Sequence, residues 1–354
     1  MERLASQHHA SDDRTTKPIS PPPSRAEAAE HNAPAPDDSA TETTPPDQPL
    51  LDRRAKSRPI PKLVLARIWF VRVFLMGWSR CFSLSGLYML GRFFGTLEYL
   101  TDYKRRRRVD RKLRQFFKDE FPASWRRRVT WRYFMRIRCD KMFYTIMDQL
   151  PRSKVMRRIR LLGEENITHA QSKGSGVYVA LCHFGSHHIA GLMMALLGYH
   201  IAGVRDPKES PVRRFVQQKF RETFPEVSKM KMFPATSFPR GIYRHLQCNN
   251  IVASLLDADR KRGRQTKTVP VTMFGEERDC LIGPLQIAIR CGATTLQGFV
   301  VSRKNFYYQL IVTPPLIDAD AVTDETQTIA NVIQHYADGV ERFARDHPDH
   351  LMNI

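Results

Sequence analysis

The sequence lacks several features that mark common classes of protein. Its six cysteines are scattered, with no Cys-x-x-Cys pair and no Cys/His spacing typical of a metal site. We therefore expect reduced thiols in a cytoplasmic compartment, and neither a disulfide framework nor a zinc site. Long apolar runs are missing too. In the apolar stretch over residues 63–100, the longest uncharged run is Cys81 to Gly91, well short of the ~18 residues that a membrane-spanning helix needs.

Large apolar residues are scarce in the first 60 residues. Segments such as Ser20-Pro-Pro-Pro-Ser24 show no helical or strand periodicity, so they predict a disordered tail over residues 1–60. The tail also lacks the charged segment and following apolar segment of a secretion signal. We expect it to contribute little to folding.

Acidic residues are in short supply relative to basic ones. The net charge is +20, and residues 61–180 hold 27 Lys and Arg against 9 Asp and Glu. The densest clusters are Lys104–Arg108 and Arg126–Arg128. Such an excess suits nucleic acid, an anionic membrane surface or an anionic acyl donor. No helix-turn-helix, zinc-finger or RNA-recognition signature accompanies it, which argues against nucleic acid.

The stretch Leu63 to Leu100 favours the membrane. Trp, Phe and Leu residues alternate there with arginines such as Arg67, Arg72 and Arg80, and a polybasic segment follows. This pattern is typical of helices that lie in the membrane interface. Two other interpretations are a helical hairpin with arginines at its rim and a tilted span with snorkelling arginines. We predict membrane-associating amphipathic helices over residues 61–108, peripheral or single-span.

The rest of the chain predicts an α/β domain over residues 109–350. Residues 109–170 are basic with helical spacing, and short apolar strands alternate with helices from Gly176 onward. The alternation indicates a central mixed sheet flanked by helices. Strands are expected at Val177–Cys182, His200–Val204, Ile251–Leu256, Thr294–Val301 and Tyr307–Val312, and helices at His187–Leu197, Pro211–Phe224, Pro239–Gln247, Pro284–Cys291 and Asp324–Ala344.

His183 stands at the most informative position of the chain. The apolar strand Val177–Cys182 ends on this histidine, and a Gly-Ser turn and an apolar helix follow. An imidazole has an unperturbed pKa near ~6.5, so it can accept a proton at physiological pH. His183 is therefore a candidate general base. The neighbouring Cys182 is either a nucleophile or, as we favour, a small residue packed at the end of a core strand.

A pair of carboxylates follows a second buried strand. Asp257 and Asp259 come directly after Ile251–Leu256 and would share one face of an extended segment. They could orient a donor, an acceptor hydroxyl or a basic residue. They could also pair with the cations of residues 260–262. A divalent metal would need a third ligand, and none is visible.

Several motifs in order resemble a known family, the lipid A biosynthesis branch of the lysophospholipid acyltransferase superfamily, which includes the bacterial lauroyl/myristoyl acyltransferases. The resemblance covers about residues 62–350. It is carried by His183 at the strand end, the loop around Arg205, the pair Asp257-x-Asp259, the loop ending in Phe274-Gly275, the helix opening Gly283-Pro284, and His347-Pro348 after the last helix.

The resemblance implies a fold like that of glycerol-3-phosphate acyltransferase and a specific chemistry. An acyl chain would pass from a thioester of acyl carrier protein or coenzyme A to a hydroxyl of a lipid A-type glycolipid or lysophospholipid, with no further cofactor. His183 would remove the hydroxyl proton. Substrate-binding positions would be Arg205, Asp257, Asp259, Phe274 and Gly275. The enzyme would work at the cytoplasmic face of the inner membrane.

The chain departs from the family motif at one catalytic position. The family carries His-x4-Asp/Glu, whereas His183 is followed four residues on by His188, and a neutral imidazole cannot supply a negative charge. Three interpretations remain open. His183 is still the base, oriented by His188 or by a remote acid such as Asp257. The site has lost acyl transfer and kept lipid binding. Or His183, His187 and His188 bind a metal, against which Gly185 and the missing acidic ligand argue.

Overall fold

The structure, a computed structural model, describes residues 60–118, 120–205, 210–234, 240–257, 267–317 and 324–351. Apart from residue 60, the predicted tail lies outside the described residues, as does Asp259. The helices are α1 (Lys62–Thr101), α2 (Tyr103–Phe117), α3 (Ala123–Ile146), α4 (Arg152–Met156), α5 (Glu164–Ser172), α6 (Ala190–Leu196), α7 (Pro211–Thr223), α8 (Pro225–Ser228), α9 (Arg240–Gln247), α10 (Gly283–Arg290) and α11 (Glu325–Asp346). The strands are β1 (Ile159–Leu162), β2 (Val177–Gly185), β3 (Ile201–Arg205), β4 (Lys231–Pro234), β5 (Ile251–Leu255), β6 (Thr268–Met273), β7 (Glu276–Leu281), β8 (Thr294–Ser302) and β9 (Tyr308–Val312).

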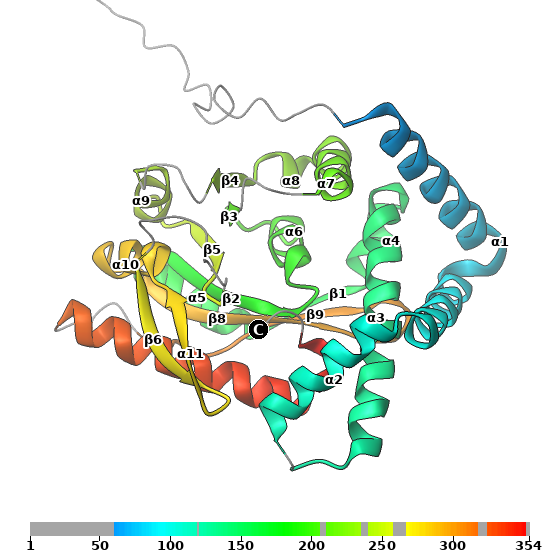
Figure 1. Ribbon diagram of the computed structural model, residues 1–354. Coiled ribbons are helices and arrows are strands. Elements are labelled where there is room, and N and C mark those ends of the chain that lie inside the picture. The colour runs from blue at the N-terminus through cyan, green and yellow to red at the C-terminus, as the bar shows by residue number, and fades with distance from the viewer. Residues whose placement is uncertain are drawn as a thin grey trace, which may run out of the picture. The chain divides into compact units, whose positions relative to one another are not determined.

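Seven of these strands form one mixed sheet in the order β1-β9-β8-β2-β5-β3-β4. The β8–β9 pair is antiparallel, and the other neighbours run parallel. The strands β6 and β7 form a separate antiparallel hairpin. Figure 1 shows α11 along one face of the sheet and α6, α7 and α8 over the other. The predicted mixed sheet flanked by helices is confirmed.

The central strand β2 contributes to two separate hydrophobic clusters. Val179 and Leu181 pack in the cluster that includes α6 and α7, whereas Tyr178 and Cys182 pack in the cluster that includes α10 and α11. This division follows from the strand period, in which successive side chains point to opposite faces. A strand covered on both faces reads as a continuous apolar run, which is how Val177–Cys182 reads in the sequence.

All five strands and all five helices expected after Gly176 are present, and the structure adds β1, β4 and the β6–β7 hairpin. The edge strands β1 and β4 have four residues each and carry Arg160 and Lys231. Four residues with a charge show too little alternation to stand out from loop sequence, and charges on edge strands are common. The hairpin was missed because Pro270 interrupts its first strand.

The helix α1 is 40 residues long and contains one non-helical residue, Ser83, with φ of 62°. Its second half lies close against α3. A Cβ added to Gly95 would meet the Met135 backbone at 2.5 Å, and one added to Gly91 would meet the Cys139 Sγ at 2.8 Å. These two glycines therefore permit the close approach of the helices, which fixes α1 to the domain.

Arg72 of α1 does not lie at a rim, as the alternative interpretation of this stretch as a helical hairpin would have it. Its side chain is 8% exposed, and its two Nη atoms donate to the Asp148 carboxylate at 2.9 and 2.5 Å. One Nη also donates to the Thr145 carbonyl at 2.6 Å, and the guanidinium lies over the Phe215 ring. A buried arginine needs such partners because an unpaired charge in a core is costly.

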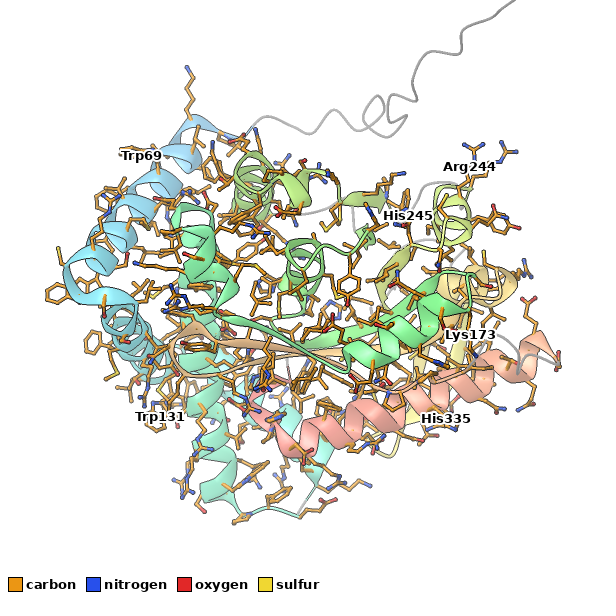
Figure 2. All side chains as sticks on the ribbon, turned by 180° about the vertical axis from the view of Figure 1, so that it is seen from behind. Trp69, Trp131, Lys173, Arg244, His245 and His335 are labelled. Carbon is orange, nitrogen blue, oxygen red and sulfur yellow. The ribbon has the colours of Figure 1, made fainter. Side chains whose placement is uncertain are left out.

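The outer side of α1 remains uncovered. Trp69 is 64% exposed and lies on the outside of the helix (Figure 2). The helix carries further exposed large apolar side chains, among them Leu63, Phe70, Phe82, Met89, Phe93 and Leu100, each more than half exposed. Among the described residues, no helix combines the length and apolar content that a membrane crossing requires.

Candidate active site

His183 and Asp257 lie side by side at the ends of two neighbouring strands. The register of the parallel pair β2–β5 aligns Leu181 with Leu255, and each member of the His-Asp pair follows two residues later. Parallel strands present their carboxyl ends at the same edge of a sheet, which is where ligands bind in open α/β folds. The local fold thus brings the two side chains together across 74 residues of sequence.

Two hydrogen bonds join the pair. The His183 backbone N–H donates to Asp257 Oδ2 at 2.7 Å, and the Nδ1 atom lies 3.0 Å from Asp257 Oδ1. Since a carboxylate accepts, the Nδ1 atom carries the proton. The other ring nitrogen, Nε2, has no hydrogen bond among the described residues and keeps a free lone pair. The Asp257 side chain is 4% exposed and that of His183 is 25% exposed, so solvent reaches the ring but hardly reaches its carboxylate partner.

His188 has a different environment. Its ring packs edge-on against Tyr144 at 4.7 Å, and no hydrogen bond or ring contact joins it to His183 within the described part of the chain. Desolvation, followed by the charges of Arg213, Arg136 and Lys141, lowers the pKa of His188 to about 3. His188 is therefore a neutral imidazole at physiological pH. Its predicted catalytic role stays a prediction, and its position shows no means of orienting His183.

His187 is the histidine that contacts His183. The two rings lie 4.9 Å apart at 71°. Desolvation and the neighbouring histidines lower the pKa of His187 well below its ordinary value, so it too stays neutral. No group of His, Cys, Asp and Glu side chains in the described residues is arranged to hold a metal ion. His187 therefore places one neutral ring against the imidazole of His183.

Cys182 does not share the site with His183. Its thiol is 1% exposed and packs in the cluster that includes α10 and α11. Burial, together with the charge of Asp257, raises the pKa of the thiol well above its ordinary value. A protonated thiol in a core is a poor nucleophile. The geometry agrees with the interpretation of Cys182 as a packing residue.

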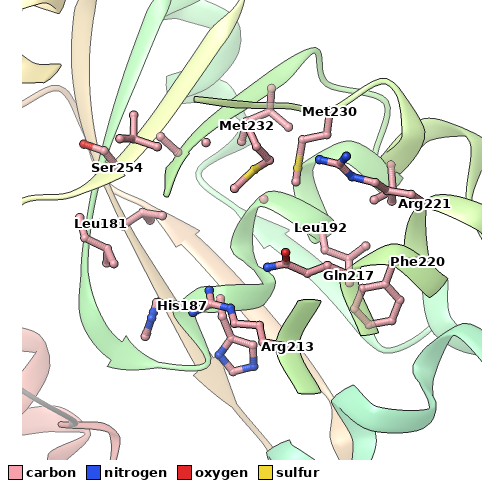
Figure 3. Close-up of a pocket in the computed structure, with 18 of the residues that line it drawn as sticks. Leu181, His187, Leu192, Arg213, Gln217, Phe220, Arg221, Met230, Met232 and Ser254 are labelled. Atoms are coloured by element: carbon pink, nitrogen blue, oxygen red, sulfur yellow. The ribbon is translucent and has the colours of Figure 1, made fainter. Parts of the chain in front are cut away.

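A cavity of about 110 Å³ opens beside the histidines, many times the space that one water needs. Figure 3 shows Leu181 and Ser254 on one side and Leu192 and Phe220 on another. The lining also includes His187, His188, Leu255, Met230, Met232, Arg213, Gln217 and Arg221. The cavity is apolar at the sheet, and α7 adds polar side chains. Since His187 both lines it and contacts His183, the cavity adjoins the His183–Asp257 pair.

The remaining predicted binding residues are not joined to this pair by any contact that the described residues show. Arg205 is the last residue of β3, and its side chain lies outside the described part of the structure. Phe274 and Gly275 form the turn of the β6–β7 hairpin, with φ of 55° and 71°. Phe274 stacks on Phe116 of α2 at 4.4 Å, which is a packing contact. Substrate binding by these residues stays a prediction.

A polar cluster that the sequence did not predict surrounds Asp140 of α3. Asp140 Oδ2 accepts hydrogen bonds from Ser186 Oγ at 2.7 Å and Ser302 Oγ at 2.9 Å. Its Oδ1 accepts from the Tyr308 hydroxyl at 3.1 Å, and Arg136 Nη1 lies 3.0 Å from Oδ2. Asp140 is 6% exposed. The cluster connects α3 to the ends of β2 and β8 and to the start of β9. Its member at the end of β2, Ser186, follows His183 by three residues.

Comparison with known proteins agrees with the motifs. The model of the family "bacterial lipid A biosynthesis acyltransferase" matches residues 53–353, and no curated protein matches significantly. The chain is also similar to the 1-acyl-sn-glycerophosphate (LPA) acyltransferase PlsC from Thermotoga maritima, at 15% identity and a TM-score of 0.34, with 75% of this chain and 97% of that chain covered. The resemblance read from the sequence is confirmed. The family model spans most of the chain, so the chain belongs to the bacterial lipid A biosynthesis acyltransferases and is an acyltransferase acting on lipids.

Proposed function

We propose that the protein moves a fatty acyl chain from an acyl thioester to a hydroxyl of a lipid A-type glycolipid or lysophospholipid, with His183 as general base and Asp257 as its acid partner. The observation that carries the proposal is the hydrogen bond between His183 Nδ1 and Asp257 Oδ1 at 3.0 Å. It supplies the negative charge that His188 cannot. The remote-acid interpretation of the motif is thereby favoured over the other two.

The chemistry follows from the free lone pair on His183. Nε2 takes the proton of the acceptor hydroxyl while the hydroxyl oxygen bonds to the thioester carbonyl carbon. Asp257 stabilises the imidazolium that forms and holds the ring in the required tautomer. The carbon–sulfur bond then breaks, and the departing thiolate takes the proton from the imidazolium. The products are an ester and a free thiol, and His183 returns to its starting state.

The cavity next to His183 is the proposed site of the acyl chain. Its sheet side is apolar, through residues such as Leu181, Leu255 and Met232, and burying methylene groups against such a wall is favourable. Leu181 precedes His183 by two residues, and Leu255 precedes Asp257 by two residues. An acyl chain lying along them would present its thioester carbonyl at the strand ends. The donor is proposed to be acyl carrier protein or acyl-CoA.

The test of the chemistry is labelled acyl transfer from both donors to a lipid acceptor. We expect His183→Ala to lose transfer by at least about a thousandfold while remaining folded, because it removes the base. The exposed His335 of α11, labelled in Figure 2, provides the matched control, and His335→Ala should leave the rate unchanged. Robust transfer by His183→Ala would exclude the mechanism. A parent protein that binds the lipid but transfers nothing from either donor would instead favour a catalytically impaired lipid-binding member of the fold.

The exposed apolar residues of α1 are the proposed contact with an anionic membrane surface, at the cytoplasmic face of the inner membrane. The side chains of Trp69, Phe70 and Phe93 are each more than 60% exposed, and exposed basic residues such as Arg67 and Arg80 lie on the same helix. Apolar insertion combined with attraction to anionic headgroups is the mode of binding of interfacial helices.

Deleting α1 would remove part of the core, so point variants test the membrane contact. We expect Trp69→Gln with Phe70→Gln and Phe93→Gln to weaken sedimentation with phosphatidylglycerol vesicles at least about tenfold. The control changes the exposed Tyr243 and Tyr307 to Gln. Added salt should weaken parent binding, because part of the attraction is Coulombic. Equal binding by the triple variant and the control would refute the assignment.

A further inference from the structure

The last two residues of β2, Phe184 and Gly185, are held by residues that do not line the cavity. Phe184 stacks on His350 with ring centroids 5.5 Å apart, and it pairs with Leu351 in an antiparallel bridge. Gly185 has φ of 53°, and a Cβ there would meet the Val300 carbonyl oxygen at 2.0 Å. The backbone between His183 and Ser186 therefore has little conformational freedom, so a displacement of Ser186 also displaces His183.

Ser186 connects this segment of backbone to Asp140. The Ser186 side chain is buried, at 2% exposure, and donates to Asp140 Oδ2 at 2.7 Å. Asp140 itself is held by Arg136 from the previous turn of α3, and Arg136 Nε donates to the Asp349 carbonyl at 2.9 Å. Both carboxylate oxygens of Asp140 and the hydroxyls of Ser186, Ser302 and Tyr308 have partners, so displacing one of these side chains leaves a buried polar group unsatisfied.

We infer that Asp140 is a positioning residue for the proposed reaction: through Ser186 it fixes the turn after β2 so that His183 stays aligned with Asp257. The inference rests on the proposed role of His183 as the base. Asp140 makes no contact with the His183 ring among the described residues, so its effect on the reaction passes through the turn. Burial and the Asp140 charge also raise the pKa of Tyr308 well above its ordinary value, so Tyr308 remains a neutral donor to the cluster.

The network contains its own matched control. Ser302 of β8 donates to the same Asp140 oxygen as Ser186, at 2.9 Å, and its hydroxyl lies 3.3 Å from that of Ser186. Ser302 is not, however, part of the segment from His183 to Ser186. Ser186→Ala and Ser302→Ala thus remove the same chemical group and the same type of hydrogen bond. We expect similar losses of melting temperature. We expect kcat to fall about tenfold in Ser186→Ala and less than about twofold in Ser302→Ala, with the KM for the acceptor unchanged in both.

Asp140→Asn tests the central residue. Its amide has one acceptor oxygen in place of two and no charge to hold Arg136, so the four donors around this side chain cannot all be satisfied and kcat should fall about 10- to 100-fold. Adding Ser186→Ala to this variant should cost little more, because the link is already broken. If Asp140→Asn does not fold, the serine pair carries the test. Equal kcat values for the two serine variants, or an unchanged kcat in Ser186→Ala, would overturn the inference.

A measurement without turnover separates this inference from the proposed function. The Nδ1 proton of His183, shared with Asp257, should give a downfield proton NMR signal that Asp257→Asn abolishes. We expect Ser186→Ala to shift or broaden this signal and Ser302→Ala to leave it in place. If His183→Ala proves active while Ser186→Ala still perturbs the signal, the assigned chemistry fails and the positioning role stands. An undisturbed signal in Ser186→Ala would contradict the positioning role whatever the activity.

Discussion

Two buried carboxylates hold the end of β2, and they act on it differently. Asp257 follows β5 and bonds directly to the backbone and ring of His183. Asp140 lies on α3 and accepts four hydrogen bonds, none of them from His183. In the proposed mechanism Asp257 selects the ring tautomer and stabilises a developing positive charge, whereas Asp140 is proposed to position the backbone that carries the ring. His183 is thus restrained at its ring by Asp257, and we propose that Asp140 restrains its backbone through Ser186.

The largest expected effect comes from removing the charge of the direct partner. Asp257→Asn keeps the size of the side chain but loses the charge that stabilises the imidazolium. In serine proteases the corresponding change of acid to amide costs about 10⁴ in kcat. We expect a loss of about 10³ to 10⁴ here, with the KM for the acceptor within a few-fold, measured by acyl transfer. The control is Asp279→Asn at an exposed position of β7. A loss below tenfold would mean that Asp257 does not serve His183.

A double variant tests whether the two carboxylates serve the same residue. If Ser186 and Asp140 act by keeping His183 aligned with Asp257, their effect should shrink once Asp257 is neutral. Ser186→Ala should therefore lower kcat about tenfold in the parent and less than about threefold in Asp257→Asn. The comparison needs rate constants for the four proteins under one set of conditions. Fully multiplicative losses would show that the two carboxylates influence different steps.

Asp257 could be identified from the sequence as a candidate site residue, but the sequence could not show which partner its carboxylate orients. The segment Ile251–Leu256 reads as a buried strand and ends on Asp257, so a position at the carboxyl edge of the sheet follows. Which strand lies beside β2 depends on topology, and the sheet could have placed β3 there. The observed order puts β5 next to β2 in a register that aligns the two strand ends. This pairing decides that Asp257 contacts His183.

Asp140 could not be found in this way. Its sequence neighbours are cations, with Arg136 four residues before it and Lys141 directly after it. An acid four residues from an arginine on a basic helix normally indicates a solvated pair. The side chain is buried because α3 packs across the ends of β2, β8 and β9, and those contacts connect residues up to 168 positions apart. Local pattern carries no information about such contacts.

His188 occupies the position where the family places its acid. We expect this residue to affect the pH dependence of stability and not proton transfer. The folded pKa of about 3 lies below the ordinary value of 6.5, so below pH 6.5 the unfolded chain takes up a proton that the folded chain does not. This contribution to stability is complete above pH 6.5 and falls as the pH drops toward 3. By pH 5.5 the loss amounts to about 1.4 kcal/mol.

His188→Gln should remove that contribution. We expect the drop in unfolding free energy between pH 7.5 and pH 5.5, measured with urea, to be about 1.4 kcal/mol smaller in the variant than in the parent. Other desolvated histidines, such as His245 with a pKa lowered to about 4, are present in both proteins and cancel in the difference. Identical pH dependence in the two proteins would mean that His188 titrates normally in the folded chain.

The smallest effect is expected from restoring the family's acid. Position 188 faces Tyr144 and the charges of Arg213, Arg136 and Lys141. A carboxylate there would pair with those cations and would not reach the His183 ring. His188→Glu should therefore change kcat by less than about threefold, whether it is introduced into the parent or into Asp257→Asn, in the same acyl-transfer assay. Recovery of Asp257→Asn by His188→Glu would contradict this expectation, because it would show that a side chain at position 188 can take over from Asp257 as the acid partner of His183.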